Sequence, residues 1–574
     1  MRVAAQVHFW PWSSITADET VNLTGNEATF NFYGSPIISL GEEADLYLPS
    51  RHERFHPLGP AFSPPFSHGR CRLFETPHGT IASTSRSGVL SIHNRNARDV
   101  VRQTVQLVPQ GIQLRDGIDE DGNPQDSPLA RMVLGWSSYF EEILDQAHLD
   151  NKINECLEWN AVLEHLQKIG AESAEPFRAL IVDIAEEMHR KLPDIVRAAR
   201  RALFRERRLL PASRAEETDI ACLLWYIRQP GRTMAEKAGP RQRLLAVARQ
   251  ETYNLHENRI LKDFLERCTA VGKRYRANAL TENPAFNTSK RVQSVQALAL
   301  LCKQLGVMPH FEDVSAPNSG TPPNYVLLND IRYRRVWYWY KRLLRQDQEK
   351  DRLWDWQSRT WADISRLLVC AAIIFHIKEL MGGSLRISAL YQGSLRVRSE
   401  QLLGCRAAAG SETGPLRIEC VKNGVIGNTW VLEIVHPEQA EHHPIASNLG
   451  ASGGHLYLVL RPLMKNLQPQ VLVLWAAHTA ASYAIPSWFD IRASAAKALR
   501  NHQVILDAAR INGSGAPKLH GLVLCSRLDA VESDTLTGKD GLHLVSVPTK
   551  PWQWMSAVEY IALVLDTVLK EMIT

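Results

Sequence analysis

The spacing of apolar residues changes twice along this 574-residue chain, and the changes set how it is organised. Residues 1–127 alternate apolar and polar side chains between turns rich in Gly, Pro and Ser, as β-strands do. Residues 128–307 follow a period of 3.6, which predicts helices. Strand-like runs return from residue 385. Because a single hydrophobic core seldom grows beyond about 300 residues, we expect several folded units.

We therefore predict an α+β multidomain protein. Its predicted parts are a β-rich N-terminal domain (1–127), an all-helical middle domain (128–307), a linker and aromatic helical segment (308–384) and a C-terminal mixed α/β domain (385–574). The acidic, turn-rich segment 115–126 marks the end of the first domain. The predicted helices of the middle domain lie near 130–149, 152–169, 172–190, 193–210, 216–228, 241–250, 255–282 and 288–306.

Composition predicts a folded cytoplasmic protein. The chain is 45% hydrophobic and 22% charged, an ordinary globular balance, and its nine cysteines are scattered singly, which fits a reducing compartment. The first residues lack the apolar core of a signal peptide, and the long apolar helix expected from Trp361 to Met381 contains charged residues, so we expect no membrane partner. The net charge of +5 is small for this length, so any nucleic-acid surface must be local.

A helix start near residue 254 carries an unusual charged triplet. Asn254 is the predicted N-cap, and Glu257, three residues later, completes a capping box. The triplet Glu257-Asn258-Arg259 then falls in the first turn, ahead of an apolar face that runs to Cys268. On physical grounds alone, a well-capped core helix explains this segment.

The same segment resembles the Glu-Asn-Arg helix of the McrC-type subunits of modification-dependent restriction systems, and of a related bacterial family whose chains end in a PD-(D/E)XK nuclease domain. Residues 323–334 are similar to that family's Pro-Asn, strand and Tyr-Arg run, and Trp361 opens an apolar helix at the corresponding distance. The resemblance covers roughly residues 240 to 530. It implies a DNA-acting subunit of a restriction-like or anti-phage system, with a C-terminal domain of restriction-endonuclease-like type and a separate AAA+ NTPase as partner.

A predicted helix that begins at Pro193 carries a one-sided series of arginines. At about 100° per residue, most of them share one stripe, and guanidinium groups in such a stripe suit the phosphates of double-stranded DNA. A solvated face of an amphipathic helix is an equally good interpretation. The predicted DNA-binding residues are Arg197, Arg200, Arg201, Arg205 and Arg208.

The resemblance also indicates where nuclease chemistry would lie. Enzymes of that type hold a divalent metal with acids on two neighbouring strands, and a lysine follows two residues after the second acid. The best match is a hairpin in which Glu419 and Glu433 would be the catalytic and metal-binding residues, with Mg²⁺ as the cofactor if the site is active and no cofactor otherwise. The lysine position is occupied by Val435, which cannot polarise water.

Two residues are candidates to replace that lysine, but neither lies at its position on the strand. His436 points to the opposite face of a regular strand, and Lys497 belongs to the following predicted helix. Three interpretations of the C-terminal domain therefore remain: a metal-dependent endodeoxyribonuclease, a nuclease-like fold without cleavage, or an unrelated domain. The expected function is a DNA-binding, nuclease-like subunit that works with an AAA+ NTPase. The alternatives are a non-catalytic DNA-binding or assembly adaptor with a degenerate nuclease fold, and a helical scaffold with no role on DNA.

Overall fold

A computed structural model of the chain describes residues 178–318, 322–355, 357–379, 425–464, 467–478, 488–508, 516–527, 540–548 and 551–573, residues 156–171, and separate shorter segments elsewhere between residues 5 and 537. The chain forms two compact units. Unit 1 combines residues 1–177 with 346–574, and unit 2 is residues 178–345. The predicted helix near 130–149 lies outside the described residues.

Unit 2 is built on two long helices that pack side by side, α7 (His256–Glu282) and α8 (Lys290–Gly306). They confirm the helices predicted at 255–282 and 288–306. The apolar face of α7 is fully buried, and Ser289 caps α8 by accepting a hydrogen bond from the Val292 amide. This unit also contains α3 (Leu180–Met188), α4 (Leu192–Arg197), α9 (Tyr325–Asn329) and the part of α10 (Ile331–Asp355) up to Arg345.

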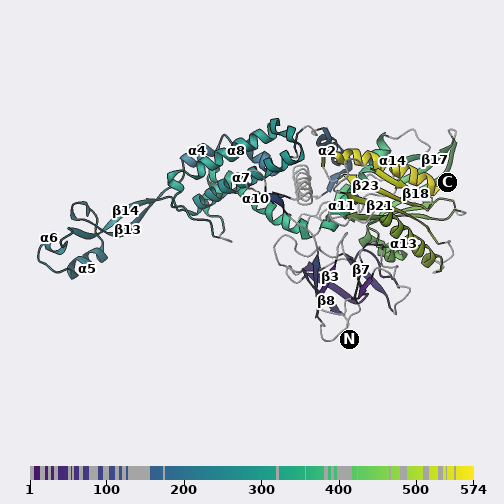
Figure 1. The fold of residues 1–574 in the computed structure, drawn as a ribbon, viewed down its shortest axis with the longest axis horizontal. Coiled ribbons are helices and arrows are strands. Elements are labelled where there is room, and N and C mark those ends of the chain that lie inside the picture. Colours follow the sequence, from purple (N-terminus) through teal and green to yellow (C-terminus); the bar gives the residue numbers. More distant parts are fainter. Residues whose placement is uncertain are drawn as a thin grey trace. The chain divides into compact units, whose positions relative to one another are not determined.

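A two-stranded ribbon interrupts these helices, so the prediction of an all-helical middle domain was wrong. Strands β13 (Ala202–Pro211) and β14 (Arg243–Thr252) pair antiparallel in one continuous register, where helices near 193–210 and 241–250 were predicted. Arginine and leucine are good helix formers, but helix propensity is a small term, and a ten-residue ladder of backbone hydrogen bonds outweighs it. The ribbon carries α5 (Ile220–Arg228) and α6 (Met234–Lys237) at its far end (Figure 1).

Unit 1 contains an eight-stranded mixed sheet in the order β15-β17-β18-β19-β20-β21-β23-β22. Strands β15 to β20 are antiparallel to their neighbours, β21 and β23 continue parallel to β20, and β22 is an antiparallel edge strand. The bounds are β15 Leu385–Ala389, β17 Leu416–Lys422, β18 Val425–Val435, β19 Leu456–Pro462, β20 Gln470–His478, β21 Lys518–Arg527, β22 Asp534–Thr537 and β23 Leu542–Pro548.

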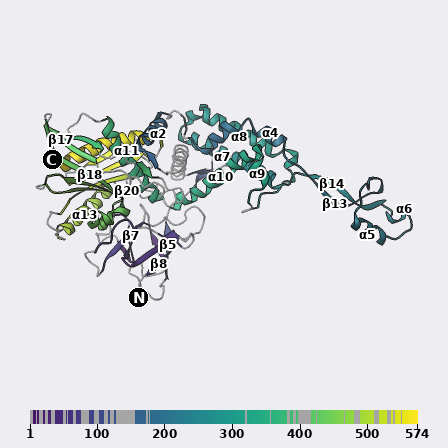
Figure 2. The same cartoon turned by 180° about the vertical axis from the view of Figure 1, so that it is seen from behind.

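Helices cover both faces of this sheet (Figures 1 and 2). One face packs against α2 (Trp159–Ala171), α11 (Gln357–Glu379) and α14 (Trp554–Ile573). The other packs against α13 (Trp488–Ala508) and the turns before β19. Side chains alternate between the two cores, since Leu458 faces the first and Val459 the second. The central strands are consequently apolar throughout, as expected for a sheet buried on both sides.

In the N-terminal part of unit 1, the elements that the structure describes are strands, as predicted. They form a sheet β2-β1-β4-β7, a second sheet β3-β9-β8-β5-β6, and a hairpin β10-β11 within the segment predicted as a boundary. Trp12 joins this part to the C-terminal sheet, because its indole N–H donates to Ser494 Oγ at 3.1 Å and its ring packs edge-on against Trp475. The bounds are β1 Ala5–His8, β2 Thr20–Asn22, β3 Glu27–Phe30, β4 Ile37–Gly41, β5 Ala44–Leu48, β6 Glu53–Arg54, β7 Cys71–Glu75, β8 Gly88–Asn94, β9 Arg102–Pro109, β10 Arg115–Ile118 and β11 Pro124–Asp126.

The described helices include none with the length and apolar character that crossing a membrane requires. The helix expected to be most apolar, α11, buries an ion pair between Asp363 and Arg366.

Candidate functional site

The predicted capping box at the start of α7 is not formed. Leu255 occupies the N-cap position without a side-chain hydrogen bond, and the helix begins at His256. Asn254 Oδ1 instead accepts hydrogen bonds from Arg259 Nε at 2.7 Å and from the Ser315 amide at 3.2 Å. Asn254 therefore links the loop that contains Ser315 to the first turn of α7. The sequence gives no local signal for the contact with Ser315, which is 61 residues away.

Asn258 fixes both ends of the ribbon to α7. Its side chain is fully buried, and Nδ2 donates to the carbonyl oxygens of Arg200 at 2.7 Å and Tyr253 at 2.9 Å. Arg200 precedes β13 and Tyr253 follows β14, so one amide group clamps the two chain segments where the ribbon leaves the helices. Asn258 Oδ1 accepts the phenol O–H of Tyr333 at 2.7 Å, and the same phenol oxygen accepts from the Arg200 amide at 3.0 Å.

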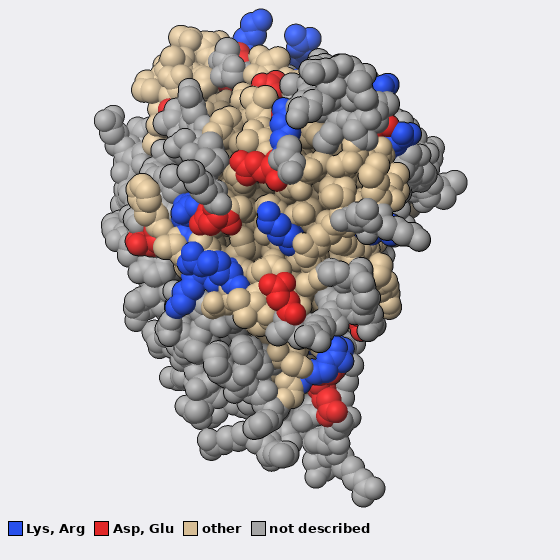
Figure 3. All heavy atoms as spheres, turned by 90° about the vertical axis from the view of Figure 1, so that its right-hand side faces the viewer, with Lys and Arg blue, Asp and Glu red and all other residues tan. Residues whose placement is uncertain are grey.

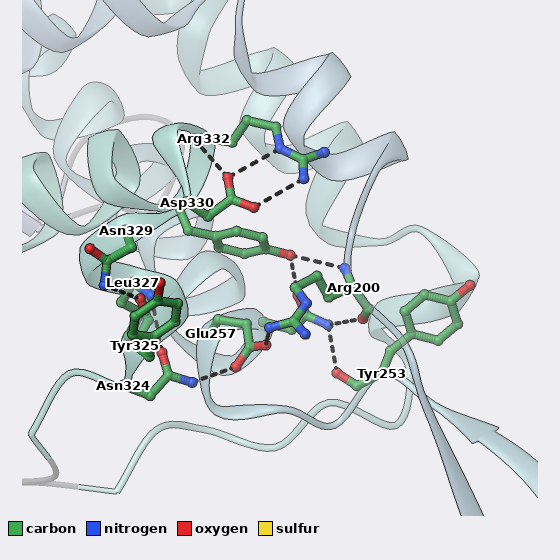
Figure 4. Close-up of polar contacts among 11 residues, drawn as sticks. Arg200, Tyr253, Glu257, Asn324, Tyr325, Leu327, Asn329, Asp330 and Arg332 are labelled. Atoms are coloured by element: carbon green, nitrogen blue, oxygen red, sulfur yellow. Dashed lines mark hydrogen bonds and ion pairs between the residues drawn. The ribbon is translucent and has the colours of Figure 1, made fainter.

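Glu257 completes this cluster (Figure 4). Its buried carboxylate accepts from Arg200 Nη1 at 3.2 Å and from Asn324 Nδ2 at 2.8 Å. A carboxylate in the first turn of a helix also interacts favourably with the positive end of the helix dipole. We call Arg200, Glu257, Asn258, Asn324 and Tyr333 the root cluster.

The segment that supplies Asn324 and Tyr333 differs from the prediction in one respect. The resemblance placed a strand after the Pro-Asn pair, whereas residues 325–329 form the short helix α9. Asn324 caps it, with Oδ1 accepting from the Leu327 amide at 3.0 Å. Burial raises the pKa of the Tyr333 phenol, which therefore remains a proton donor to Asn258.

The predicted arginine ridge does not exist as one surface. Arg197 lies on α4, Arg200 belongs to the root cluster, Arg201 directly precedes β13, and Arg205 and Arg208 lie on the ribbon. Successive side chains of a strand point to opposite faces, so Arg205 and Arg208 are on different sides of the ribbon. The predicted DNA-binding surface was based on a helical stripe, and the ribbon removes that stripe.

Carboxylates from the same unit pair with these arginines. Glu217 bridges Arg205 and Arg249, and lies 3.0 Å from the latter. The other pairs are Arg197 with Asp194 at 3.7 Å, Arg201 with Glu251 at 2.8 Å, Arg207 with Asp219 at 2.6 Å, and Arg208 with Glu206 at 2.6 Å. A phosphate would have to compete with these carboxylates for each guanidinium group. Both Arg205 with Glu217 and Arg207 with Asp219 are twelve residues apart, and this equal spacing was the sequence signal that could have predicted the ion pairs.

Asp219 has a second role at the start of α5. Its Oδ1 accepts from the Cys222 amide at 2.9 Å, which makes it the N-cap of that helix. The hydrogen bonds from Cys222 and from Arg207 lower the pKa of Asp219 to about 2. The acids between β13 and α5 thus hold the helix against the ribbon.

The structure does not bring Glu419 and Glu433 together. Both lie on the sheet face opposite Ile418 and Leu432, but Glu419 is paired in register with Thr429, four residues before Glu433 on β18. At about 3.3 Å per residue, the two positions are about 13 Å apart along the strands. Among the described residues, no cluster of three or more His, Cys, Asp or Glu side chains is placed to hold a metal ion.

Each of these acids has its own basic partner. Arg417 pairs with Glu419, while Arg461 and His443 bind Glu433, with His443 Nε2 at 3.0 Å. His443 Nδ1 accepts from the amides of Ile445 and Ala446, so the ring proton is on Nε2 and is donated to Glu433. Burial raises the pKa of Glu433, but the hydrogen bonds from His443 and Arg461 outweigh it, and the net shift is downward.

The strands that directly precede α13 are β19 and β20, not the pair that carries the two predicted acids. The side chains that they contribute to the core beneath α13 are Tyr457, Val459, Val471, Val473, Trp475 and Ala477, and none is acidic. The two candidate replacements for the missing lysine do not fill the gap, because His436 is buried and caps the following turn, while Lys497 is exposed on α13. On the part of unit 1 drawn in Figure 3, basic and acidic side chains are interspersed, without a large patch of one sign.

Residues 163–338 match the family described as "Domain of unknown function (DUF2357)". The match spans the root cluster, the ribbon and both helices at its end, but none of the strands of the eight-stranded sheet. No curated protein matches the chain.

Proposed function

We propose that this chain is a non-catalytic assembly adaptor of a bacterial restriction-like or anti-phage system, in which the ribbon is the assembly element and a separate AAA+ NTPase is a partner. The observation that carries the proposal is the clamp formed by Asn258 on both ends of the ribbon. A two-stranded ribbon is marginally stable alone. Anchoring its roots with buried hydrogen bonds holds an extended arm in a defined direction, which an assembly contact requires.

The charges of the ribbon favour a protein partner over DNA. Four of its arginines, Arg205, Arg207, Arg208 and Arg249, are already paired with carboxylates, and binding to phosphate would give up those ion pairs. Specific DNA binding depends on many unpaired cations facing one duplex. Exposed apolar side chains on the ribbon and its tip, including Phe204 at 58% and Leu209 at 50%, instead suit a protein surface.

The chemistry of the sheet supports an adaptor with a degenerate nuclease fold. Helix α13 follows β20 and is itself followed by the parallel strand β21, the order that the resemblance assigns to a nuclease core. Beneath α13, strand β20 presents Val471 and Val473. Apolar side chains cannot ligate Mg²⁺, which requires oxygen ligands.

A trimmed ribbon tests the assembly role directly. Pro211 and Arg243 are paired across the ribbon, so residues 212–242 can be replaced by Asn-Gly, a two-residue turn that closes a hairpin. We expect this variant to fold, to lose only the circular dichroism of α5 and α6, and to lose co-elution with the AAA+ NTPase that we propose as its partner. The full chain with Asn329→Ala, a change at an exposed helix end, is the control. Unchanged co-elution of the trimmed variant would contradict the proposal.

A metal-dependent endodeoxyribonuclease is the second candidate function, because Glu419 and Glu433 do share one sheet face. Plasmid nicking with Mg²⁺ or Mn²⁺ separates the two functions. We expect no cleavage by the purified chain, alone or with the NTPase. Cleavage that disappears in Glu433→Gln would show that the chain is an endodeoxyribonuclease and would contradict the adaptor function.

A further inference from the structure

The helix α5, at the far end of the ribbon, presents an apolar stripe to solvent. Ile220, Leu223, Leu224 and Ile227 are 77%, 51%, 51% and 68% exposed. They are spaced i, i+3, i+4 and i+7, which places them on one face of the helix. The opposite face is the one that packs, since Cys222 is 1% exposed. In a monomer, a stripe of this kind remains in contact with water at a free-energy cost.

The stripe is symmetric under reversal of the helix direction. Its order is Ile, Leu, Leu, Ile, and its spacings of three, one and three residues read the same from either end. If two copies of α5 lie antiparallel about a two-fold axis, Ile220 of each copy meets Ile227 of the other, and Leu223 meets Leu224. A surface that is complementary to itself in this way is what a two-fold interface requires.

The charges at the two ends of α5 fit the same arrangement. Glu216, before the helix, is exposed, and Arg228 and Arg232, at and after its end, are also exposed. In the described part of the chain none of the three side chains forms an ion pair, whereas the neighbouring acids Glu217 and Asp219 are held by arginines of the ribbon. Antiparallel pairing places the acidic end of one copy beside the basic end of the other. Opposite charges at the rim of an apolar contact fix its register.

We propose that α5 is a self-association surface that pairs antiparallel with α5 of a second copy of this chain. The ribbon makes the pairing sterically feasible, because ten-residue strands at about 3.3 Å per residue hold the tip about 30 Å from the root cluster. The inference goes beyond the proposed function, since the tips pair whether or not the chain works with an NTPase.

Sedimentation equilibrium of the full-length protein over a wide concentration range is the test. We expect the wild-type chain to form dimers as its concentration rises, and Ile227→Glu to remain monomeric. The matched control is Leu300→Glu, which places the same charge at a residue of α8 that is 55% exposed and outside the stripe. A wild-type chain that is monomeric throughout, or a dimer that persists in Ile227→Glu, would overturn the proposal.

A charge exchange tests the antiparallel register. Arg228→Glu and Glu216→Arg should each weaken dimerisation by about tenfold, because each places like charges at the rim. The double variant reverses both signs and should restore the wild-type dissociation constant. Independent, additive losses in the double variant would rule out this register. The assay contains no NTPase, so its failure leaves the trimmed-ribbon experiment able to support or contradict the proposed function independently.

Discussion

Tyr333 of α10 donates its phenol proton to the side-chain oxygen of Asn258, at 2.7 Å, across 75 residues of sequence. Both side chains are fully buried. The phenol oxygen also accepts from the Arg200 amide, and the Asn258 amide group donates to two carbonyls, so the pair connects α7, α10 and both ends of the ribbon. A buried polar network in which every member has a partner is rigid and specifies one arrangement of its elements.

Replacing Asn258 by Ala should loosen the ribbon at its root. The change leaves two carbonyls and one phenol without their buried partner, and we expect a loss of about 3 kcal/mol. Hydrogen exchange at the amides of β13 and β14 should therefore become about a hundredfold faster. Asn329→Ala removes a hydrogen bond to Tyr325 O from the same residue type at an exposed position, and should leave exchange unchanged. Equal exchange in both variants would contradict the clamp.

Releasing two arginines of the ribbon should raise the affinity of the chain for DNA. Glu217 holds Arg205 and Arg249, so Glu217→Gln frees both cations. In filter binding with duplex DNA, the slope of log affinity against log salt should steepen by about two. Glu216→Gln makes the same change in net charge without releasing an arginine, and should give the wild-type slope. Equal slopes for the two variants would show that the ion pairs do not restrain the arginines.

The buried histidine of α13 should make unit 1 sensitive to mild acid. Burial lowers the pKa of His502 to about 4, and neither ring nitrogen has a hydrogen-bond partner among the described residues. Between about pH 6.5 and pH 4 the unfolded chain binds a proton that the folded chain does not, so stability falls as the pH falls through this window.

His502→Leu should remove that loss. At pH 5 the variant should gain about 2 kcal/mol relative to wild type through the abolished protonation, a gain that vanishes at pH 8. Urea unfolding at the two pH values measures the difference. His442→Leu, at an exposed position, serves as the control and should show no pH-dependent gain. A gain of the same size at both pH values would indicate packing instead of protonation.

Glu433 and its partners Arg461 and His443 should stabilise the segment after β18 and should not bind a metal ion. Glu433→Gln weakens the bonds to Arg461 and His443, so we expect faster hydrogen exchange in residues 436–449, which His443 holds by capping Ala446. Calorimetric titration with Mg²⁺ should show no binding to wild type or variant. Magnesium binding that disappears with Glu433→Gln would contradict this role.

The helices α7 and α8 and the strand-rich N-terminal part could be predicted because their signals are local. Apolar residues at helical spacing, such as Ile260, Leu261 and Phe264, must share one face whatever that face contacts. Strands β15 and β17 to β21 of the sheet were likewise recognisable as short apolar runs, whereas β22 and β23 were not predicted.

The ribbon could not be predicted in the same way. Residues 202–211 contain good helix formers, and their extended conformation depends on pairing with residues 243–252 across an intervening 31 residues, 212–242. The same holds for the root cluster, since the partners of Asn258 at Arg200 and Tyr333 are brought to it only by folding.

By itself the sequence determined the helix faces, the strand content and the palindromic order of Ile220, Leu223, Leu224 and Ile227, because periodicity and residue order are properties of a few consecutive turns. Tertiary structure alone decided that this stripe is exposed, that the ribbon arginines are paired with acids, and that Glu419 and Glu433 lie apart. Exposure, ion pairing and strand register depend on which distant segments come into contact. Those contacts are set by the free-energy minimum of the whole folded chain.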